Sequence, residues 1–280
     1  MPFLELFDET LDINSTLNYD LSVQISSGRV SFCILDTIRK KYVLIRDYIP
    51  EGTNFPDLEG VEEILGKDEF LSRKYRKINI ITPSPKFTIV PTPLYDKVKM
   101  EEYFRFNHVA EEGSIILASK LNYPDSYLVY STSRAENELI TRHLESGKVM
   151  HHLIPLMNYI SESRKGAQVN HIHLHIERDF FNIILFDHSS LKLCNSFFYK
   201  NISDILYYIM NAFRNLNIGQ EETIYISGDY QNQAELNTAL SQYVRHIRYS
   251  VPSNGNSFSY VFNEVEIHRF LTIFSTTSCE

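Results

Sequence analysis

The stretch Leu21–Asp36, LSVQISSGRVSFCILD, superposes without a gap on Ile172–Asp187, IHLHIERDFFNIILFD, 151 residues later in the chain. In both stretches apolar side chains recur at every second position, which is the period of a β-strand with one buried face. Each stretch contains two such runs joined by a short polar turn, so each predicts an antiparallel hairpin. The shared pattern and order predict that the chain contains an internal duplication.

The segments that follow the two hairpins also match. A further strand comes next in each half, at Tyr42–Tyr48 and at Leu191–Tyr199. In the second half, helical spacing of apolar residues then predicts a helix that includes 202–213. A strand at Thr223–Ser227, a helix near 231–244 and a strand at His246–Val251 complete the order β-β-β-α-β-α-β. Three antiparallel strands leading into crossover units indicate a mixed sheet with helices on its faces.

The first half follows the same plan with an insertion. Within residues 77–93 apolar and polar side chains alternate, and Pro83, Pro85, Pro91 and Pro93 interrupt this pattern. A short helix and a strand follow, after which the strand, helix and strand of the plan resume near residue 126. We therefore predict a first lobe over residues 1–165, with a small insertion at about 77–125. The second lobe then covers residues 166–280, including an aromatic C-terminal segment.

Composition excludes several classes of protein. The 280 residues are about twice the typical length of one domain, which agrees with two lobes. The formal net charge of −8 disfavours nucleic-acid binding, so no nucleic acid is expected as a partner. No apolar run approaches the roughly 18 residues of a membrane span, and the acidic N-terminus lacks the features of a signal peptide. Three widely spaced cysteines without a CxxC pair are typical of a cytoplasmic protein.

The duplicated unit with an insertion in its first half resembles the actin-like ATPase superfamily. Within it, residues 127–155 and 77–106 resemble segments of the pilus-assembly and cell-division branch of bacterial actin-like proteins. Nearly the whole chain also resembles an uncharacterised Bacteroidota family known only as a domain of unknown function. The pieces that carry this second likeness are 21–32, 151–155, 195–199 and 268–270.

The resemblance implies an α/β fold class: a duplicated RNase H-like (actin-like ATPase) fold of two lobes. Each lobe is expected to hold a mixed five-stranded sheet flanked by helices. It also implies a candidate site in a cleft between the lobes, where such proteins clamp ATP phosphates between two hairpin turns. Beside them lies a Gly-Gly turn that contacts the adenosine. In this chain the matching positions are Gln24, Ser26, Ser27 and Gly28 in the first lobe, and His175, Glu177, Arg178, Asp179, Ser227, Gly228 and Asp229 in the second.

These positions depart from the pattern that ATP binding needs. The superfamily carries an Asp before each Gly-rich bend, where its carboxylate holds hydrated Mg²⁺, and this chain has Gln24 and His175 there. In the second turn, Glu177 and Asp179 would repel a polyphosphate, at about 4 kcal/mol for each unit-charge pair at about 4 Å and an effective dielectric constant of about 20. Their side chains also keep the main chain away from phosphate oxygens.

The sequence therefore predicts a non-catalytic, cytoplasmic pseudo-ATPase that acts as an adaptor or scaffold through contacts with unidentified protein partners. No cofactor and no metal are expected, and the oligomeric state is left open. The alternative is a divergent nucleotide-binding enzyme that uses the interlobe cleft and holds its metal with other residues. Both hypotheses place the site of interest at the same two groups of residues.

Three histidines alternate along the second hairpin. His171, His173 and His175 share one face of a predicted strand, and a His-x-His pair on a strand can supply two zinc ligands. A metal-binding module would need further ligands from elsewhere in the chain. The other interpretation is that these side chains are hydrogen-bonded beneath a helix.

Aromatic residues leave a second question open. Phe197, Phe198, Tyr207 and Tyr208 follow patterns typical of core residues. The aromatic side chains of residues 258–274 exceed what one amphipathic strand needs. They would be core if this segment folds back on the second lobe, and a partner surface if it is exposed.

Overall fold

The computed structural model describes residues 1–26, 28–49, 58–165, 169–230, 232–252 and 255–278. The chain forms two compact units. Unit 1 comprises Met1–Asn158, Ser253–Val265 and Thr272–Glu280, and unit 2 comprises Tyr159–Pro252 and Glu266–Leu271. The C-terminal part of the chain thus contributes to both units. The domain boundary at residue 165 stays a prediction.

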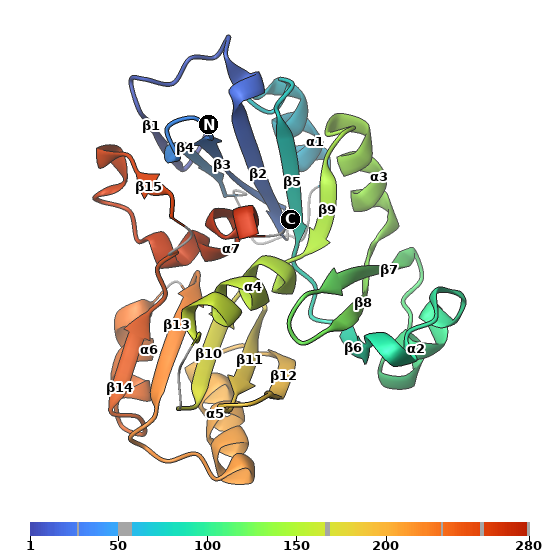
Figure 1. Cartoon of the computed structure of the whole chain (residues 1–280), viewed down its shortest axis with the longest axis vertical. Coiled ribbons are helices and arrows are strands. Elements are labelled where there is room, and N and C mark those ends of the chain that lie inside the picture. The colour runs from blue at the N-terminus through green and yellow to red at the C-terminus, as the bar shows by residue number, and fades with distance from the viewer. Residues whose placement is uncertain (27, 50–57, 166–168, 231, 253–254, 279–280) are drawn as a thin grey trace. The chain divides into compact units, whose positions relative to one another are not determined.

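The main sheet of unit 1 has seven strands (Figure 1). Five of them run in the order β4-β3-β2-β5-β9. Their bounds are Lys41–Tyr48 (β4), Arg29–Asp36 (β3), Tyr19–Ser26 (β2), Lys77–Thr82 (β5) and Lys148–His151 (β9). The short strands β1 (Leu4–Phe7) and β15 (Ser257–Phe258) both pair with β4 and extend the predicted five-stranded sheet.

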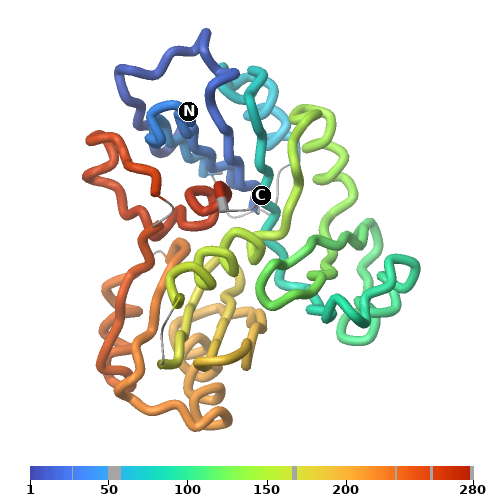
Figure 2. Tube along the Cα trace, viewed as in Figure 1, coloured from blue at the N-terminus to red at the C-terminus, as the bar shows by residue number. Residues whose placement is uncertain are grey.

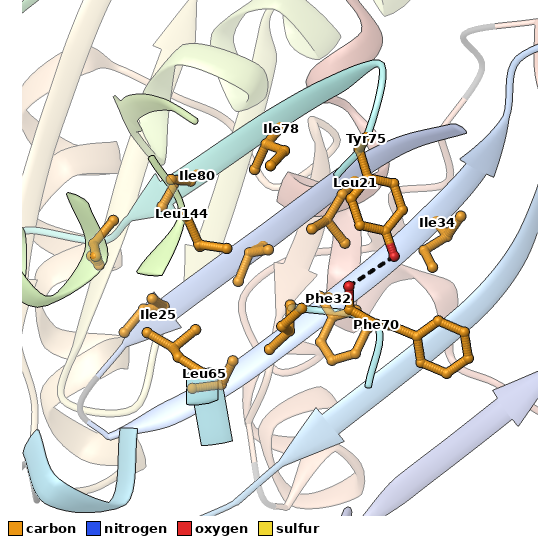
Figure 3. Close-up of a cluster of buried hydrophobic side chains, with 14 of the residues drawn as sticks. Leu21, Ile25, Phe32, Ile34, Leu65, Phe70, Tyr75, Ile78, Ile80 and Leu144 are labelled. Atoms are coloured by element: carbon orange, nitrogen blue, oxygen red, sulfur yellow. Dashed lines mark hydrogen bonds between the residues drawn. The ribbon is translucent and has the colours of Figure 1, made fainter. Parts of the chain in front are cut away.

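Helices cover one face of this sheet because its apolar side chains point there. The helices α1 (Leu58–Lys67) and α3 (Arg134–His143) bury Leu65 and Ile140 against β2 and β3. Figure 3 shows this core, in which the Tyr75 hydroxyl donates a 3.0 Å hydrogen bond to the carbonyl oxygen of Phe70. The hydroxyl of Ser133 accepts the amide of Glu136 and so fixes the start of α3.

A small antiparallel sheet is inserted between β5 and α3. Its strands β6 (Phe87–Pro91), β7 (Ser114–Leu121) and β8 (Ser126–Ser133) run in the order β6-β8-β7. The helix α2 (Met100–Asn107) packs on it through Phe104. The insertion thus begins after β5 and includes β8, unlike the predicted range of about 77–125. The reason is that Ile78 and Ile80 of β5 are buried in the main core, as a central strand requires.

The sheet of unit 2 has five strands in the order β12-β11-β10-β13-β14 (Figure 1). Their bounds are Leu191–Phe198 (β12), Phe180–Phe186 (β11), His171–Ile176 (β10), Thr223–Gly228 (β13) and His246–Tyr249 (β14). The helices α5 (Ile202–Leu216) and α6 (Gln233–Leu240) cover its apolar face. The side chains of Asn201 and Asn232 cap these two helices.

The strand registers confirm the duplication. Leu21 lies opposite Ile34 in unit 1, and the equivalent Ile172 lies opposite Leu185 in unit 2. Each sheet also has one irregularity in the pairing of its next strand, between Ile34 and Leu35 and between Leu185 and Phe186. The two irregularities fall at the same position of the repeat, which a chance likeness of two hairpins does not explain.

The C-terminal segment from residue 253 onward belongs partly to unit 1 and partly to unit 2, and it can be followed in red in Figure 2. Phe258, Phe262 and Phe274 form an aromatic cluster with Tyr42 in unit 1, rather than on the second lobe. The helix α4 (Leu153–Ser163) carries the chain from unit 1 into unit 2. Within the described residues, no helix combines the length and apolar character that crossing a membrane would take.

Candidate functional site

The first group of candidate residues lies at the turn between β2 and β3. Ser26 pairs with Arg29 across the turn, and Gly28 has a φ of +80°, a left-handed conformation that favours glycine. Ser27 lies outside the described residues. The Arg29 guanidinium donates to Asp47 through Nε at 2.7 Å and Nη2 at 2.6 Å. The turn keeps its small glycine, but its flanking charge is already paired within unit 1.

The polar face of β2 is covered by the last part of the chain. Gln24, at the position where the resemblance leads us to expect a metal-holding Asp, accepts a hydrogen bond from the Thr272 hydroxyl through Oε1. The Ser22 hydroxyl lies 2.6 Å from the Thr276 hydroxyl oxygen, and both groups are buried. Gln24 therefore has a partner from the chain's own C-terminal segment.

The second group of candidate residues gathers where β10 and β13 lie side by side. His175 lies opposite Ser227, and Ile176 lies opposite Gly228. Gly228 has a φ of +90°, and a Cβ added there would fall 2.0 Å from the carbonyl oxygen of Ile176. The next amide, that of Asp229, donates to the same oxygen at 2.9 Å. Only glycine permits this approach of the two strands.

A buried hydrogen-bonded network joins β10 to β13. The Ser227 Oγ lies 2.8 Å from both His173 Nε2 and His175 Nδ1. His175 Nε2 lies 3.2 Å from Glu177 Oε1. With Glu177 as a carboxylate, His175 donates from Nε2 and its Nδ1 accepts the Ser227 hydroxyl proton. His173 then donates from Nε2 to Ser227, which leaves its Nδ1 unprotonated.

Two observations agree with this proton order. His173 Nδ1 is buried and has no hydrogen-bond partner among the described residues, which suits a nitrogen without a proton. Burial, reinforced by His171 and His175, holds the pKa of His173 well below its usual value. His173 is therefore neutral at physiological pH.

The row Glu177, His175 and Ser227 has the residue types of a nucleophilic triad. Such a triad works only when a substrate carbonyl can reach the hydroxyl oxygen. Ser227 is 0% exposed and His175 is 1% exposed. This arrangement therefore ties β10 to β13 and does not present a nucleophile.

The turn between β10 and β11 is anchored through its main chain. The Glu177 amide donates to the Phe180 carbonyl oxygen at 2.9 Å. Tyr199 donates its amide to the Asp179 carbonyl oxygen at 3.3 Å and its hydroxyl to the Glu177 carbonyl oxygen at 2.8 Å. Arg178 is exposed. No described residue of this turn has the positive φ that Gly28 has in the first turn.

Asp229 is engaged by the C-terminal segment of unit 2. Arg269 lies on the short helix Ile267–Phe270, and its Nη2 donates to Asp229 Oδ2 at 3.0 Å. Its Nε lies 2.9 Å from Asp229 Oδ1. The adjacent His268 contacts Gln233 at 2.9 Å between the two Nε2 atoms. The loop after β13 is thus held by residues of 266–271.

His171 is the remaining histidine of β10. His171 stacks on Tyr225 with ring centroids 4.4 Å apart, and burial lowers its pKa to about 4. His171 and His173 do share one face, with Tyr159 of α4 edge-on to His173. Among the described residues, no three His, Cys, Asp or Glu side chains are placed to hold a metal ion together.

Sequence reasoning missed the C-terminal residues that engage these positions. The structure brings Gln24, Ser26 and Gly28 together in unit 1, and His175, Glu177, Ser227, Gly228 and Asp229 in unit 2. Arg269 and Thr272, the partners of Asp229 and Gln24, are isolated polar residues without periodicity, as is Thr276, which contacts Ser22. The one signal was the segment His268–Phe270, which stood out as distinctive without a role.

Comparison with protein families places the chain. The family model described as "Protein of unknown function (DUF3822)" matches residues 8–247. The chain belongs to the DUF3822 family. No curated protein matches it. The sequence-based resemblance to a domain family without an assigned activity is confirmed.

Solved structures show the fold of this DUF3822 chain. A Bacteroides thetaiotaomicron protein with an actin-like ATPase fold and unknown function is 20% identical, with a TM-score of 0.77, and the match covers 94% of this chain and 99% of that one. A chain of the PilM–PilN type IV pilus biogenesis complex is 10% identical, with a TM-score of 0.58 and coverage of 93% and 98%. The ethanolamine utilization protein EutJ of Carboxydothermus hydrogenoformans is 8% identical, with a TM-score of 0.51 and coverage of 96% and 91%. The actin-like ATPase fold is confirmed.

Proposed function

We propose that this DUF3822 chain is a non-catalytic actin-like protein, a pseudo-ATPase of the cytoplasm that works as an adaptor or scaffold through protein contacts. The observation that carries the proposal is the engagement of both candidate groups by the C-terminal segment. Thr272 hydrogen-bonds Gln24 in unit 1, and Arg269 pairs with Asp229 in unit 2. The polar atoms that would meet phosphate or hydrated metal have partners from the chain itself.

The chemistry of the two turns supports the same proposal. A neutral amide at position 24 holds a divalent cation far more weakly than a carboxylate does. At position 175 the imidazole is committed to Ser227 and Glu177 inside the sheet. Glu177 and Asp179 add negative charge where the fold family binds a polyphosphate. Neither turn supplies both the charge and the free main chain that phosphate binding needs.

A scaffold role suits a fold whose relatives include a chain of a protein–protein complex. The PilM–PilN type IV pilus biogenesis complex contains a chain of this architecture. By analogy, the present chain is expected to act through protein surfaces. No nucleic acid, metal or cofactor takes part in this proposal.

Isothermal titration with Mg–ATP tests the loss of nucleotide binding. The full-length protein is expected to give no heat of binding, with any Kd weaker than about 1 mM, or about 4 kcal/mol. A parallel titration of the Arg269→Ala, Thr272→Val double variant separates two causes. If it binds while the wild type does not, the C-terminal segment alone blocks the site. Stoichiometric binding to the wild type would contradict the proposal and favour a divergent nucleotide-binding enzyme.

A further inference from the structure

The two equivalent edge strands of the sheets differ in how they are covered. In unit 1 the outer edge of β4 is paired with β1 along residues 44–47 and with β15 at residues 41–42. In unit 2 the equivalent strand, β12, pairs only with β11 among the described residues. The duplication thus supplies an internal reference for what a covered edge looks like.

Burial along the two strands follows this difference. Every residue of β4 from Tyr42 to Asp47 is buried. In the eight-residue β12 no residue is fully buried. An eight-residue strand that presents unpaired main-chain groups is a template for another strand, and proteins usually shield such edges.

The open edge also carries exposed aromatic side chains on both faces of the sheet. On the α5 face, Phe197 stacks on Tyr208 with ring centroids 4.5 Å apart, and the neighbouring Tyr207 is 66% exposed. On the other face, Ser196 accepts a hydrogen bond from Asn182, and Phe198 shares its side by the two-residue period. Phe198 is 61% exposed. A strand added here would remove these rings from water.

We propose that β12 pairs antiparallel with β12 of a second copy of this chain, which joins two five-stranded sheets into one. Strand pairing about a two-fold axis places identical strands side by side and satisfies both open edges at once. This inference concerns self-association and does not depend on the fate of the nucleotide site.

The composition of β12 favours this occupant and selects a register. Lys192 is the only charged residue of the strand and stands near the end opposite Phe198. In the antiparallel register centred on Asn195, Lys192 lies beside the partner's Phe198 instead of beside a second lysine. With Asn195 opposite the partner's Asn195, Leu193 also meets the partner's Phe197, so apolar residues face each other.

Sedimentation equilibrium of the full-length protein, from about 1 µM to about 100 µM, tests the proposal. The wild type is expected at twice the mass of the chain at the upper end. The Phe198→Lys variant is expected to remain a monomer with an unchanged circular dichroism spectrum, because the side chain is exposed. The matched control is Phe106→Lys, since Phe106 is 88% exposed on α2 and lies outside the proposed interface. It should dimerise as the wild type does.

Cross-linking tests the register. In a Cys194→Ser, Cys279→Ser background, Asn195→Cys is expected to form an intermolecular disulfide under mild oxidation, because directly opposed strand residues lie within disulfide reach. The control His188→Cys, on an exposed residue before β12, is expected to give no such dimer. A wild type that is monomeric at every concentration overturns the proposal and leaves the edge to a different protein. A dimer that survives Phe198→Lys also overturns it.

Discussion

Strands β2 and β10 hold the same place in their sheets, yet their polar faces have different partners. On β2, Ser22 and Gln24 meet the hydroxyls of Thr276 and Thr272 from the chain's end. On β10, the equivalent His173 and His175 share the hydroxyl of Ser227 on the adjacent strand. The polar face of β2 thus has hydrogen-bond partners from a distant segment of the chain, whereas the polar face of β10 has them from the adjacent strand of its own sheet.

The apolar faces of the same two strands have not diverged in this way. Leu21 and Ile25 pack under α1 and α3, and the equivalent Ile172 and Ile176 pack under α5 and α6. Burial of these side chains holds each unit together, so any apolar residue of similar volume serves. The polar faces need only satisfied hydrogen bonds, and each unit meets that need with a different set of groups.

The largest expected loss of stability comes from a substitution at Gly228, at the end of β13. Gly228→Ala places a Cβ against the Ile176 carbonyl oxygen at a positive φ, so we expect unit 2 to lose about 4 kcal/mol or more of unfolding free energy. The control Gly219→Ala meets no atom within 4 Å and is expected to change little. Urea denaturation followed by circular dichroism measures both. A loss below about 1 kcal/mol for Gly228→Ala would show that the strands do not approach as closely as described.

The second prediction concerns pH dependence, because β10 carries three histidines on this face where β2 carries Asp20, Ser22 and Gln24. The pKa of His171 is about 4 in the folded protein, against a usual 6.5, so the unfolded chain takes up the proton first. Stability from this group is full above pH 6.5 and declines as the pH falls toward 4, by about 3 kcal/mol.

Removal of the imidazole should abolish that decline. His171→Phe keeps a ring against Tyr225 and is expected to lose about 2 to 3 kcal/mol less than the wild type between pH 7.5 and pH 4.5. The matched variant at the exposed His188, His188→Phe, should follow the wild type. Urea denaturation at the two pH values measures the difference. Equal pH dependence of wild type and His171→Phe would mean that His171 is not buried as a neutral group.

A smaller difference is expected between the two central hydroxyls. Ser227→Ala leaves nitrogens of His173 and His175 without their partner in a buried space, at a cost of about 2 kcal/mol. Ser22→Ala removes a contact with the Cys33 thiol and the partner of Thr276, whose hydroxyl also lies 3.3 Å from the Ile273 carbonyl oxygen, so about 1 kcal/mol is expected. Equilibrium denaturation of both variants gives the ranking. A larger loss for Ser22→Ala than for Ser227→Ala would contradict the hydrogen-bond network described between β10 and β13.

The smallest effect concerns the C-terminal segment in unit 2. Arg269→Ala removes the partner of Asp229 at a partly exposed position, so a loss of about 1 kcal/mol is expected, with faster hydrogen exchange in residues 266–271. Arg245→Ala, which removes an exposed pair with Glu221, is expected to stay within about 0.5 kcal/mol. Unchanged exchange in Arg269→Ala would show that this pair does not hold the segment.

The fold was predictable because buried faces leave a period in the sequence. The alternation in β2, β3, β10 and β11 marked both hairpins, and the fixed offset between them marked the duplication. β1 and β15 were not predictable, because four and two residues are too short to show a period. The insertion was placed too early because β5 and β6 follow each other closely and both alternate.

The candidate site was predictable only in part, for a related reason. The positions of Gln24, His175 and Gly228 followed from the repeat and the resemblance. Thr272, the partner of Gln24, and Arg269, the partner of the candidate Asp229, are distant in sequence and are single polar or charged residues. Hydrogen bonds between such residues depend on tertiary placement, which leaves no local pattern.

A crystal structure of the full-length protein grown with Mg²⁺ and a non-hydrolysable ATP analogue tests the central claim most directly. The account predicts that Thr272 stays bonded to Gln24 and Arg269 to Asp229, with no triphosphate at either turn. A triphosphate in contact with the turn at Gly28 or the main chain at Gly228, with either of those pairs broken, would contradict it.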